Sequence, residues 1–265
     1  MKAKGRLALL SVGAVAAVVM GAVLLVSMHI VPGRGSKSSG CPAPNCARLR
    51  ASLADFLAVP VPSDTAWRTV DGVGGNEYRT SLPGVGIFDV DGSGRVTLGV
   101  FVQAQPSASP VANIEQAQAS ATSWAQTHHM DLSGLQHRAS EKHDRGTFIE
   151  YGFRWQAKKD SAWLPTFIGI DVYSSGGVAD FVQETIPVTI ATQPHVGAAE
   201  ALTRARAAAP AGATIDDSTD LVVVVHANGS QQLVWICSFR TPANTFVPTL
   251  GSALVDAQNG AVAIL

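Results

Sequence analysis

Charged residues are scarce in this chain of 265 residues, since Lys, Arg, Asp and Glu together make up 15% of it, against 46% for hydrophobic residues. So low a content of charge excludes a disordered chain and indicates a folded one. The formal net charge is −1, and the Lys and Arg residues are scattered rather than interleaved with aromatic residues in a stripe. A surface that follows a phosphate backbone is therefore excluded, and we expect no nucleic-acid partner.

The chain also lacks the short motifs of common catalytic sites. It contains no Gly-x-Ser-x-Gly nucleophile turn, no Gly-x-x-x-x-Gly-Lys phosphate loop and no His-Glu-x-x-His metal pair. We therefore predict that the protein is not an enzyme, and we assign no catalytic residue, no metal ligand and no cofactor. The alternative is a metal-dependent hydrolase in the region His128–His143, whose candidate ligands are His128, His129, His137 and His143.

A long uncharged segment stands at the N-terminus. Lys2, Lys4 and Arg6 precede residues 7–31, a run of 25 residues that would rise about 37 Å as a helix and so could cross a bilayer. The basic residues before the run predict a cytoplasmic N-terminus, and the absence of a cleavage site predicts an uncleaved signal-anchor. We expect a single-pass cell-membrane protein with an extracytoplasmic C-terminal part. The predicted segments are a cytoplasmic tail (1–6), a transmembrane helix in contact with membrane lipid (7–31) and a flexible stalk (32–45).

A segment that begins with proline and closes with glycine recurs three times. Its copies occupy residues 82–96, 164–178 and 247–262, and their closing glycines, Gly94, Gly176 and Gly260, are 82 and 84 residues apart. Such spacing indicates several copies of one small unit. We predict that each of these glycines forms a structural turn between two strands.

The hydrophobic pattern predicts a helix at the start of each unit and strands after it. Helices are expected between Cys46 and Pro60, after the capping residue Asn113, and over residues 196–209. Alternation from Ile149 to Trp155 predicts a half-buried strand, and Asn228-Gly229 between two alternating runs predicts a hairpin. The expected fold class is α+β: a transmembrane helix, then tandem units, each a helix packed on a small antiparallel β-meander. The predicted units are 46–105, which is partial or degenerate, 106–190 and 191–265.

The third unit resembles a PepSY domain, the module named for peptidase propeptides. The resemblance rests on the alanine-rich helix Ala198–Ala209, the strand Leu233–Ile236 and the closing run Val255–Val262. The second unit is similar more loosely, through Asp171–Val178, and the first keeps an Asp in Val90–Val96. The resemblance covers residues 113–265. It implies a non-catalytic module of secreted or membrane-anchored bacterial proteins that binds or restrains peptidases or other envelope proteins.

From these observations we expect a membrane-anchored, extracytoplasmic binding or regulatory protein of the bacterial envelope. Its partner would be an envelope protein, held by β-augmentation at an exposed strand edge or at a concave face between units. The competing hypotheses are the hydrolase of the His128–His143 region and a purely structural spacer.

Two further motifs have structural interpretations. The run Asp89–Gly94 begins like a calcium loop, but the twelfth position is Val100 instead of the bidentate Glu, so we interpret it as a hairpin turn. Cys41 and Cys46 lie close together outside the predicted membrane span, and we expect them to form a disulfide. The rival pairing joins Cys46 to Cys237.

Overall fold

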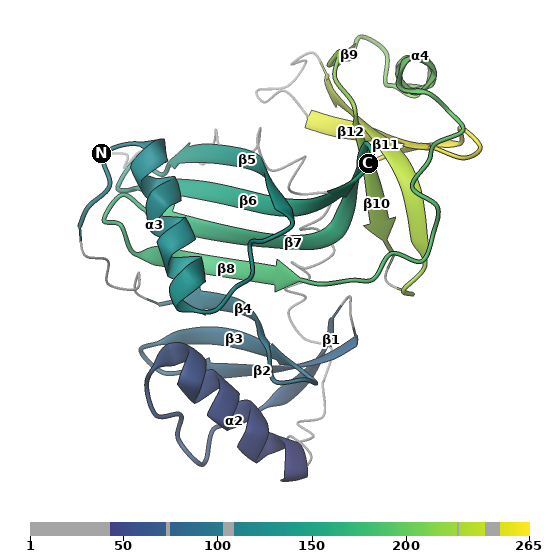
Figure 1. Cartoon of the computed structure of the whole chain (residues 1–265). Coiled ribbons are helices and arrows are strands. Elements are labelled where there is room, and N and C mark those ends of the chain that lie inside the picture. Colours follow the sequence, from purple (N-terminus) through teal and green to yellow (C-terminus); the bar gives the residue numbers. More distant parts are fainter. Residues whose placement is uncertain (1–42, 73–74, 103–108, 227, 242–249) are drawn as a thin grey trace, which may run out of the picture. The chain divides into compact units, whose positions relative to one another are not determined.

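The computed structural model of the chain describes residues 43–72, 75–102, 109–226, 228–241 and 250–265 (Figure 1). These residues form two compact units. The larger unit comprises the described part of residues 43–193 together with 222–233, and the smaller unit comprises 194–221 and the described part of 234–265.

Eight strands of the larger unit form one continuous antiparallel sheet. Its order is β1-β2-β3-β4-β8-β7-β6-β5, so that β4 pairs with β8 in the middle. Two helices precede the two groups of strands in the chain, α2 before β1 and α3 before β5. The elements are α2 (Ala43–Leu57), β1 (Arg68–Gly72), β2 (Gly75–Leu82), β3 (Gly86–Asp91), β4 (Val96–Phe101), α3 (Ile114–Thr127), β5 (Leu135–Asp144), β6 (Ile149–Lys159), β7 (Ala162–Tyr173) and β8 (Val178–Glu184).

This continuous sheet corrects the predicted fold class. Tandem units, each a helix on its own small meander after a transmembrane helix, are not what the structure shows. The chain is mostly β, with thirteen strands and three helices among the described residues, and the strands of 46–105 and 106–190 belong to the same sheet. The physical reason is that a separate meander would leave the edges of β4 and β8 unpaired, and their pairing satisfies those backbone groups.

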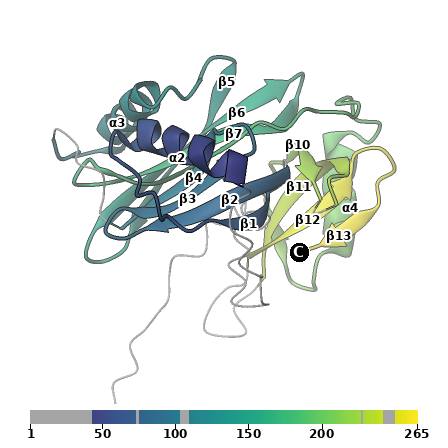
Figure 2. The same cartoon turned by 90° about the horizontal axis from the view of Figure 1, so that it is seen from below.

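Both helices of the larger unit cover the same face of the sheet (Figure 2). On α2, Leu49 and Leu53 are fully buried, as the predicted apolar stripe requires. On α3, Asn113 caps the first turn by accepting a hydrogen bond of 2.9 Å from the backbone N–H of Gln116, which confirms the predicted cap. Beneath the helices the sheet contributes large buried side chains, among them Phe88, Phe153, Ile170 and Phe181.

The pairing of β4 with β8 depends on a glycine. Gly99 lies directly opposite Phe181, and a Cβ atom at position 99 would approach the ring of Phe181 to 2.3 Å. The ring occupies this space and stacks with Phe56 of α2 and Trp124 of α3, at centroid distances of 5.1 Å to each. One aromatic cluster thus ties both helices to the middle of the sheet.

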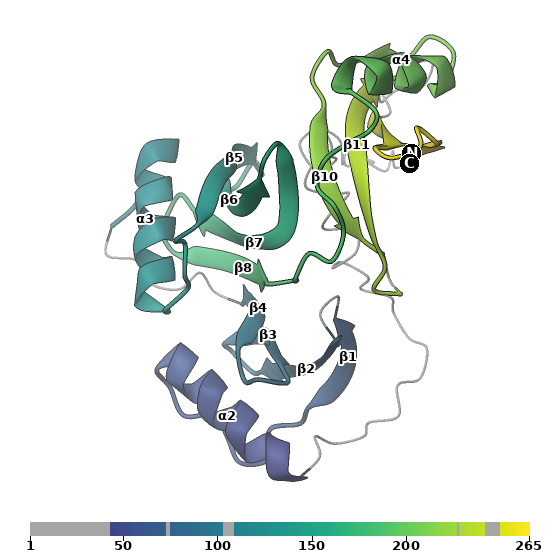
Figure 3. The same cartoon turned by 45° about the vertical axis from the view of Figure 1, so that its right-hand side comes forward.

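The smaller unit contains the third described helix and the last strands of the chain (Figure 3). Helix α4 packs on β12 and β13, and β11 pairs with β12 and with the short β9. The indole N–H of Trp235 donates a buried hydrogen bond of 2.7 Å to the carbonyl of Val196, which fixes the segment before α4. Its complete elements are α4 (Ala198–Ala208), β9 (Thr214–Ile215), β12 (Leu250–Asp256) and β13 (Val262–Ile264). Strands β10 (Asp220–Val225) and β11 (Gln231–Arg240) belong to it only in part, because residues 222–233 belong to the larger unit.

The predictions for the membrane are corrected as well. Among the described residues, no helix has the length and apolar character needed to cross a bilayer. The predicted span, residues 7–31, lies outside the described residues, as do the tail 1–6 and most of the stalk. The structure therefore does not support a single-pass transmembrane helix, a signal-anchor or the cell-membrane localisation that followed from them.

Candidate functional site

The face of the eight-stranded sheet opposite the helices carries most of its ionisable side chains, and we call it the second face. Residues that pair directly across antiparallel strands project to the same side of a sheet. Arg79 pairs with Asp89, Asp89 with Leu98, and Leu98 with Val182, so this face runs continuously from β2 to β8. On it, Ile87 and Val100 pair with each other and are 42% and 43% exposed.

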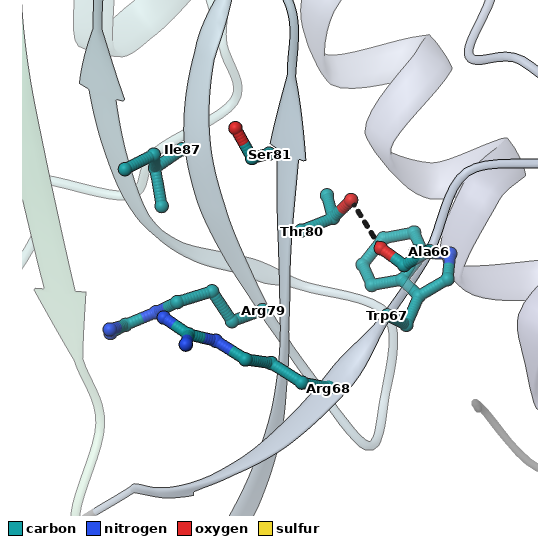
Figure 4. Close-up of a pocket in the computed structure, with 7 residues that line it drawn as sticks. All are labelled: Ala66, Trp67, Arg68, Arg79, Thr80, Ser81 and Ile87. Carbon is teal, nitrogen blue, oxygen red and sulfur yellow. Dashed lines mark hydrogen bonds between the residues drawn. The ribbon is translucent and has the colours of Figure 1, made fainter. Parts of the chain in front are cut away.

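A pocket of about 400 Å³ lies beside the start of β1 and is also lined by residues of β2 and β3 (Figure 4). Figure 4 shows Arg68 and Arg79 projecting to the same side, whereas Trp67 and Thr80 project to the other. The hydroxyl of Thr80 donates a hydrogen bond of 2.8 Å to the carbonyl of Ala66 and so holds the chain that enters β1. The residues that line the pocket are Ala66, Trp67, Arg68, Arg79, Thr80, Ser81 and Ile87.

One of the two arginines is engaged inside the sheet. Arg79 donates from Nε and NH2 to the two carboxylate oxygens of Asp89, each at 2.6 Å, and the Asp89 side chain is only 3% exposed. This hydrogen bonding raises the pKa of Arg79 and fixes the guanidinium in place. Arg68, its direct neighbour on β1, is exposed and has no ion-pair partner among the described residues. The pocket therefore offers one fixed and one available positive charge.

On β5 to β8 the second face is acidic toward one end of the strands, and we call this part the acidic half. Asp171 on β7 and Asp180 on β8 are direct cross-strand neighbours whose carboxyl groups hydrogen bond to each other. Burial, followed by the charge of Glu150, raises the pKa of Asp180 to about 6. Burial and the charge of Asp180 raise that of Asp171 as well. Two such carboxyl groups hold a proton between them near neutral pH, because both cannot be charged in contact.

The flanking carboxylates of the acidic half have basic side chains as neighbours. Glu150 accepts from NH2 of Arg145 at 3.2 Å, and Glu141 lies 3.3 Å from Nε2 of His143. Burial raises the pKa of Glu141, although the adjacent His143 opposes the shift. These acidic residues therefore belong to local pairs on the sheet, and nothing in their arrangement forms a nucleophile with its base.

The four candidate histidines lie in different elements and have different surroundings. His128 ends α3 and stacks on Trp124 and Phe56, with centroids 4.2 Å and 4.6 Å away, and burial lowers its pKa. His129 follows in a left-handed turn, whereas His137 and His143 lie on β5. The described parts of the chain contain no group of three His, Cys, Asp or Glu side chains that could hold a metal ion.

The three closing glycines occupy turns between successive strands. Gly94, Gly176 and Gly260 have φ angles of 98°, 87° and 77°, a region that favours glycine. In the first turn the carboxylate of Asp91 accepts hydrogen bonds from the backbone N–H of Ser93 at 2.8 Å and of Arg95 at 3.0 Å. This carboxylate is thus used by the turn itself, as the hairpin interpretation expects.

Cys46 lies on α2, but Cys41 lies outside the described residues, so the expected disulfide between them stays a prediction. Cys46 belongs to the larger unit and Cys237 to the smaller one, so the rival pairing of these two also stays a prediction. Cys237 is buried on β11, where burial raises the pKa of its thiol to about 11.

Sequence reasoning did not find the arginine pocket or the carboxyl pair. Arg79 and Asp89 stand on the two sides of Pro83-Gly84, and a hairpin centred there would have placed them opposite each other. Asp171 and Asp180 flank the turn at Gly176 in the same way. The usable signal in both cases was a polar residue at matching distances from a predicted turn.

Comparison with known proteins does not place the chain in a family. No family model matches the chain, and no curated protein matches it. Among solved structures, the YpeB C-terminal domain of Bacillus megaterium is similar with a TM-score of 0.43 and 13% identity, over 82% of this chain and 96% of that one. A likeness with so low a TM-score carries no conclusion about the fold or the family of this chain.

Proposed function

We propose that the protein is a non-catalytic binding module that takes up an extended segment of a partner protein along the free edge of β1. The observation that carries the proposal is the position of this edge beside the arginine pocket. Among the described strands β1 pairs with β2 alone, so its other edge presents unpaired backbone groups. A partner strand added there would form backbone hydrogen bonds for affinity and use the pocket for specificity.

The opposite edge of the same sheet is less suited to this role. Strand β5 is longer, but a bulge between His137 and Ala139 interrupts its register, and the strand carries charged residues such as Lys142. Bulges and lysines on an edge strand are common protections against pairing with another chain. Strand β1 also carries charged residues, Arg68 and Asp71, but its pairing with β2 runs in register from Arg68 to Gly72.

The pocket also favours a particular segment. Arg68 offers its charge to an acidic side chain, and the exposed Ile87 offers an apolar surface in the same pocket. Side chains two residues apart in a strand project to the same side. The favoured segment is therefore extended, with an acidic and an apolar residue in alternate positions. The PepSY resemblance of the sequence supports a peptidase as the class of partner.

The proposal is tested by crosslinking at the two edges of the sheet. A photo-crosslinking residue is placed at Thr69 in one full-length variant and at Lys142 in the other, and each is activated in cells. We expect one protein to be recovered repeatedly from position 69 and not from position 142. The exchange Arg68→Glu should abolish its recovery, because it reverses the available charge of the pocket, whereas Lys142→Glu should leave it unchanged.

The same experiment separates the competing hypotheses. Equal recovery at both edges, or recovery that ignores Arg68→Glu, would contradict binding at β1. Repeated recovery of no protein would favour the spacer. No contact among the described residues favours the hydrolase of the His128–His143 region, because they show no set of ligands for its metal.

A further inference from the structure

Arg154 is a buried guanidinium at the centre of β6, on the second face of the sheet. The residue is only 2% exposed. Its Nε donates a hydrogen bond of 3.1 Å to Oε1 of Gln156, and its Cζ lies 3.9 Å from the ring centroid of Phe167. Its NH2 nitrogen is buried and has no hydrogen-bond partner among the residues that the structure describes. The great majority of buried polar nitrogens in proteins have a hydrogen-bond partner, so this one needs an explanation.

No acidic group compensates the charge of Arg154 within the described chain. Burial and then the positive charge of Arg138 lower the pKa of Arg154 to about 9, and no carboxylate opposes them. The guanidinium still keeps its proton at neutral pH, because that pKa lies above 7. An unpaired charge in a buried position is strongly unfavourable, because it has lost its hydration without gaining a partner. The fold therefore holds a cation whose counter-ion it does not supply.

Arg154 lies near other cationic side chains, and the strand pairing around it is irregular. Arg138 also donates to Oε1 of Gln156, so that one amide oxygen joins the two guanidinium groups. Arg138 and Lys158 lie over the ring of Trp163, with Cζ at 5.0 Å and Nζ at 4.6 Å from its centroid. The register shifts on both sides of this place, between β5 and β6 and between β6 and β7. Bulges of this kind re-aim side chains and are frequent beside functional sites.

We propose that Arg154 is the centre of a binding site for an oxyanion, either a carboxylate or a phosphate group, which supplies the missing counter-charge. The NH2 nitrogen donates to the oxyanion, since a guanidinium forms strong, charge-assisted hydrogen bonds with both groups. The oxyanion enters from the side of Lys158, which is exposed and holds its amine over Trp163. This site lies on β6, away from the pocket of Arg68, and does not depend on the function proposed for β1.

Binding to the full-length protein tests the proposal. Thermal unfolding at pH 7 is compared in sodium chloride, sodium phosphate and sodium acetate at equal ionic strength. We expect phosphate or acetate to raise the unfolding midpoint above that in chloride, in a saturable manner. A rise in phosphate alone assigns a phosphate site, and a rise in both assigns a general oxyanion site. The variant Arg154→Met should lose at least tenfold in affinity, whereas Arg204→Met, at an exposed arginine of α4, should bind as the wild type does.

A second variant keeps the test decisive if Arg154→Met does not fold. Lys158→Met changes an exposed side chain and is expected to weaken binding severalfold while the unfolding midpoint in chloride stays within a few degrees. The proposal is overturned if neither anion acts beyond chloride. It is also overturned if every variant at position 154 or 158 that folds binds the anion as the wild type does.

Discussion

The carboxyl pair of β7 and β8 predicts an unusual dependence of stability on pH, which the substitution Asp180→Asn should remove. In the folded protein the pKa of Asp180 is raised from 3.8 to about 6. The folded state therefore binds more protons than the unfolded state between these values, and stability falls as pH rises through them. Above about pH 6 the loss is complete and stays constant.

The magnitude follows from the shift. A difference of one pKa unit corresponds to about 1.36 kcal/mol, so the step from 3.8 to about 6 gives roughly 3 kcal/mol for this group. Asp180→Asn keeps the shape of the side chain and removes its titration. We expect the difference in unfolding free energy between variant and wild type to rise by roughly this amount, in favour of the variant, between pH 3 and pH 8.

The assay is chemical unfolding of both proteins from pH 3 to pH 8, followed by tryptophan fluorescence. Asp64→Asn, at an exposed position before β1, is the control and should leave the pH dependence of the wild type in place. Glu184, with a pKa of about 7, cancels in the comparison because every variant retains it and Asp180 is not a cause of its shift. Asp171 adds to the difference in the same direction, because the charge of Asp180 helps to raise its pKa and the variant lacks that charge. A constant difference between Asp180→Asn and the wild type over this pH range would refute the shared proton.

Two further predictions concern the packing of the sheet. Gly99→Val places atoms where Phe181 lies and should lower the free energy of unfolding by about 1–3 kcal/mol, measured by denaturant titration; an unchanged midpoint would show that the ring moves freely. Arg79→Met leaves the buried carboxylate of Asp89 without its partner and should destabilise the protein by about 3–5 kcal/mol at pH 7. The matched exchange Arg206→Met, in an exposed ion pair, should change it by less than about 1 kcal/mol, and equal losses would contradict this account.

The local elements could be predicted from the sequence because their determinants are local. Asn113 caps α3 through a residue three positions away, and the strand expected from Ile149 to Trp155 lies within β6. The hairpin at Asn228-Gly229 is present, and the N–H of Gly229 donates a hydrogen bond of 2.8 Å to the carbonyl of His226. In each case the relevant interaction spans only a few residues.

The continuous sheet and the second face could not be predicted in this way. The opposition of Gly99 and Phe181 joins segments far apart in the chain, and neither residue signals the other in a single sequence. The alternation from Ile149 to Trp155 predicts a half-buried strand with Arg154 on its polar, exposed side. In the structure Arg154 is only 2% exposed. Burial of the second face depends on tertiary packing that alternation alone does not encode.

The joint between β4 and β8 also has a consequence for how the chain folds. Each of the two four-stranded groups consists of neighbours in sequence, which form early, whereas Leu98 meets Val182 only after a long loop closes. Until then two backbone edges stay open, and the β8 edge of one molecule is complementary to the β4 edge of another. A concentrated refolding chain is therefore exposed to domain-swapped assembly at this joint, and slow dilution should favour the monomeric closure.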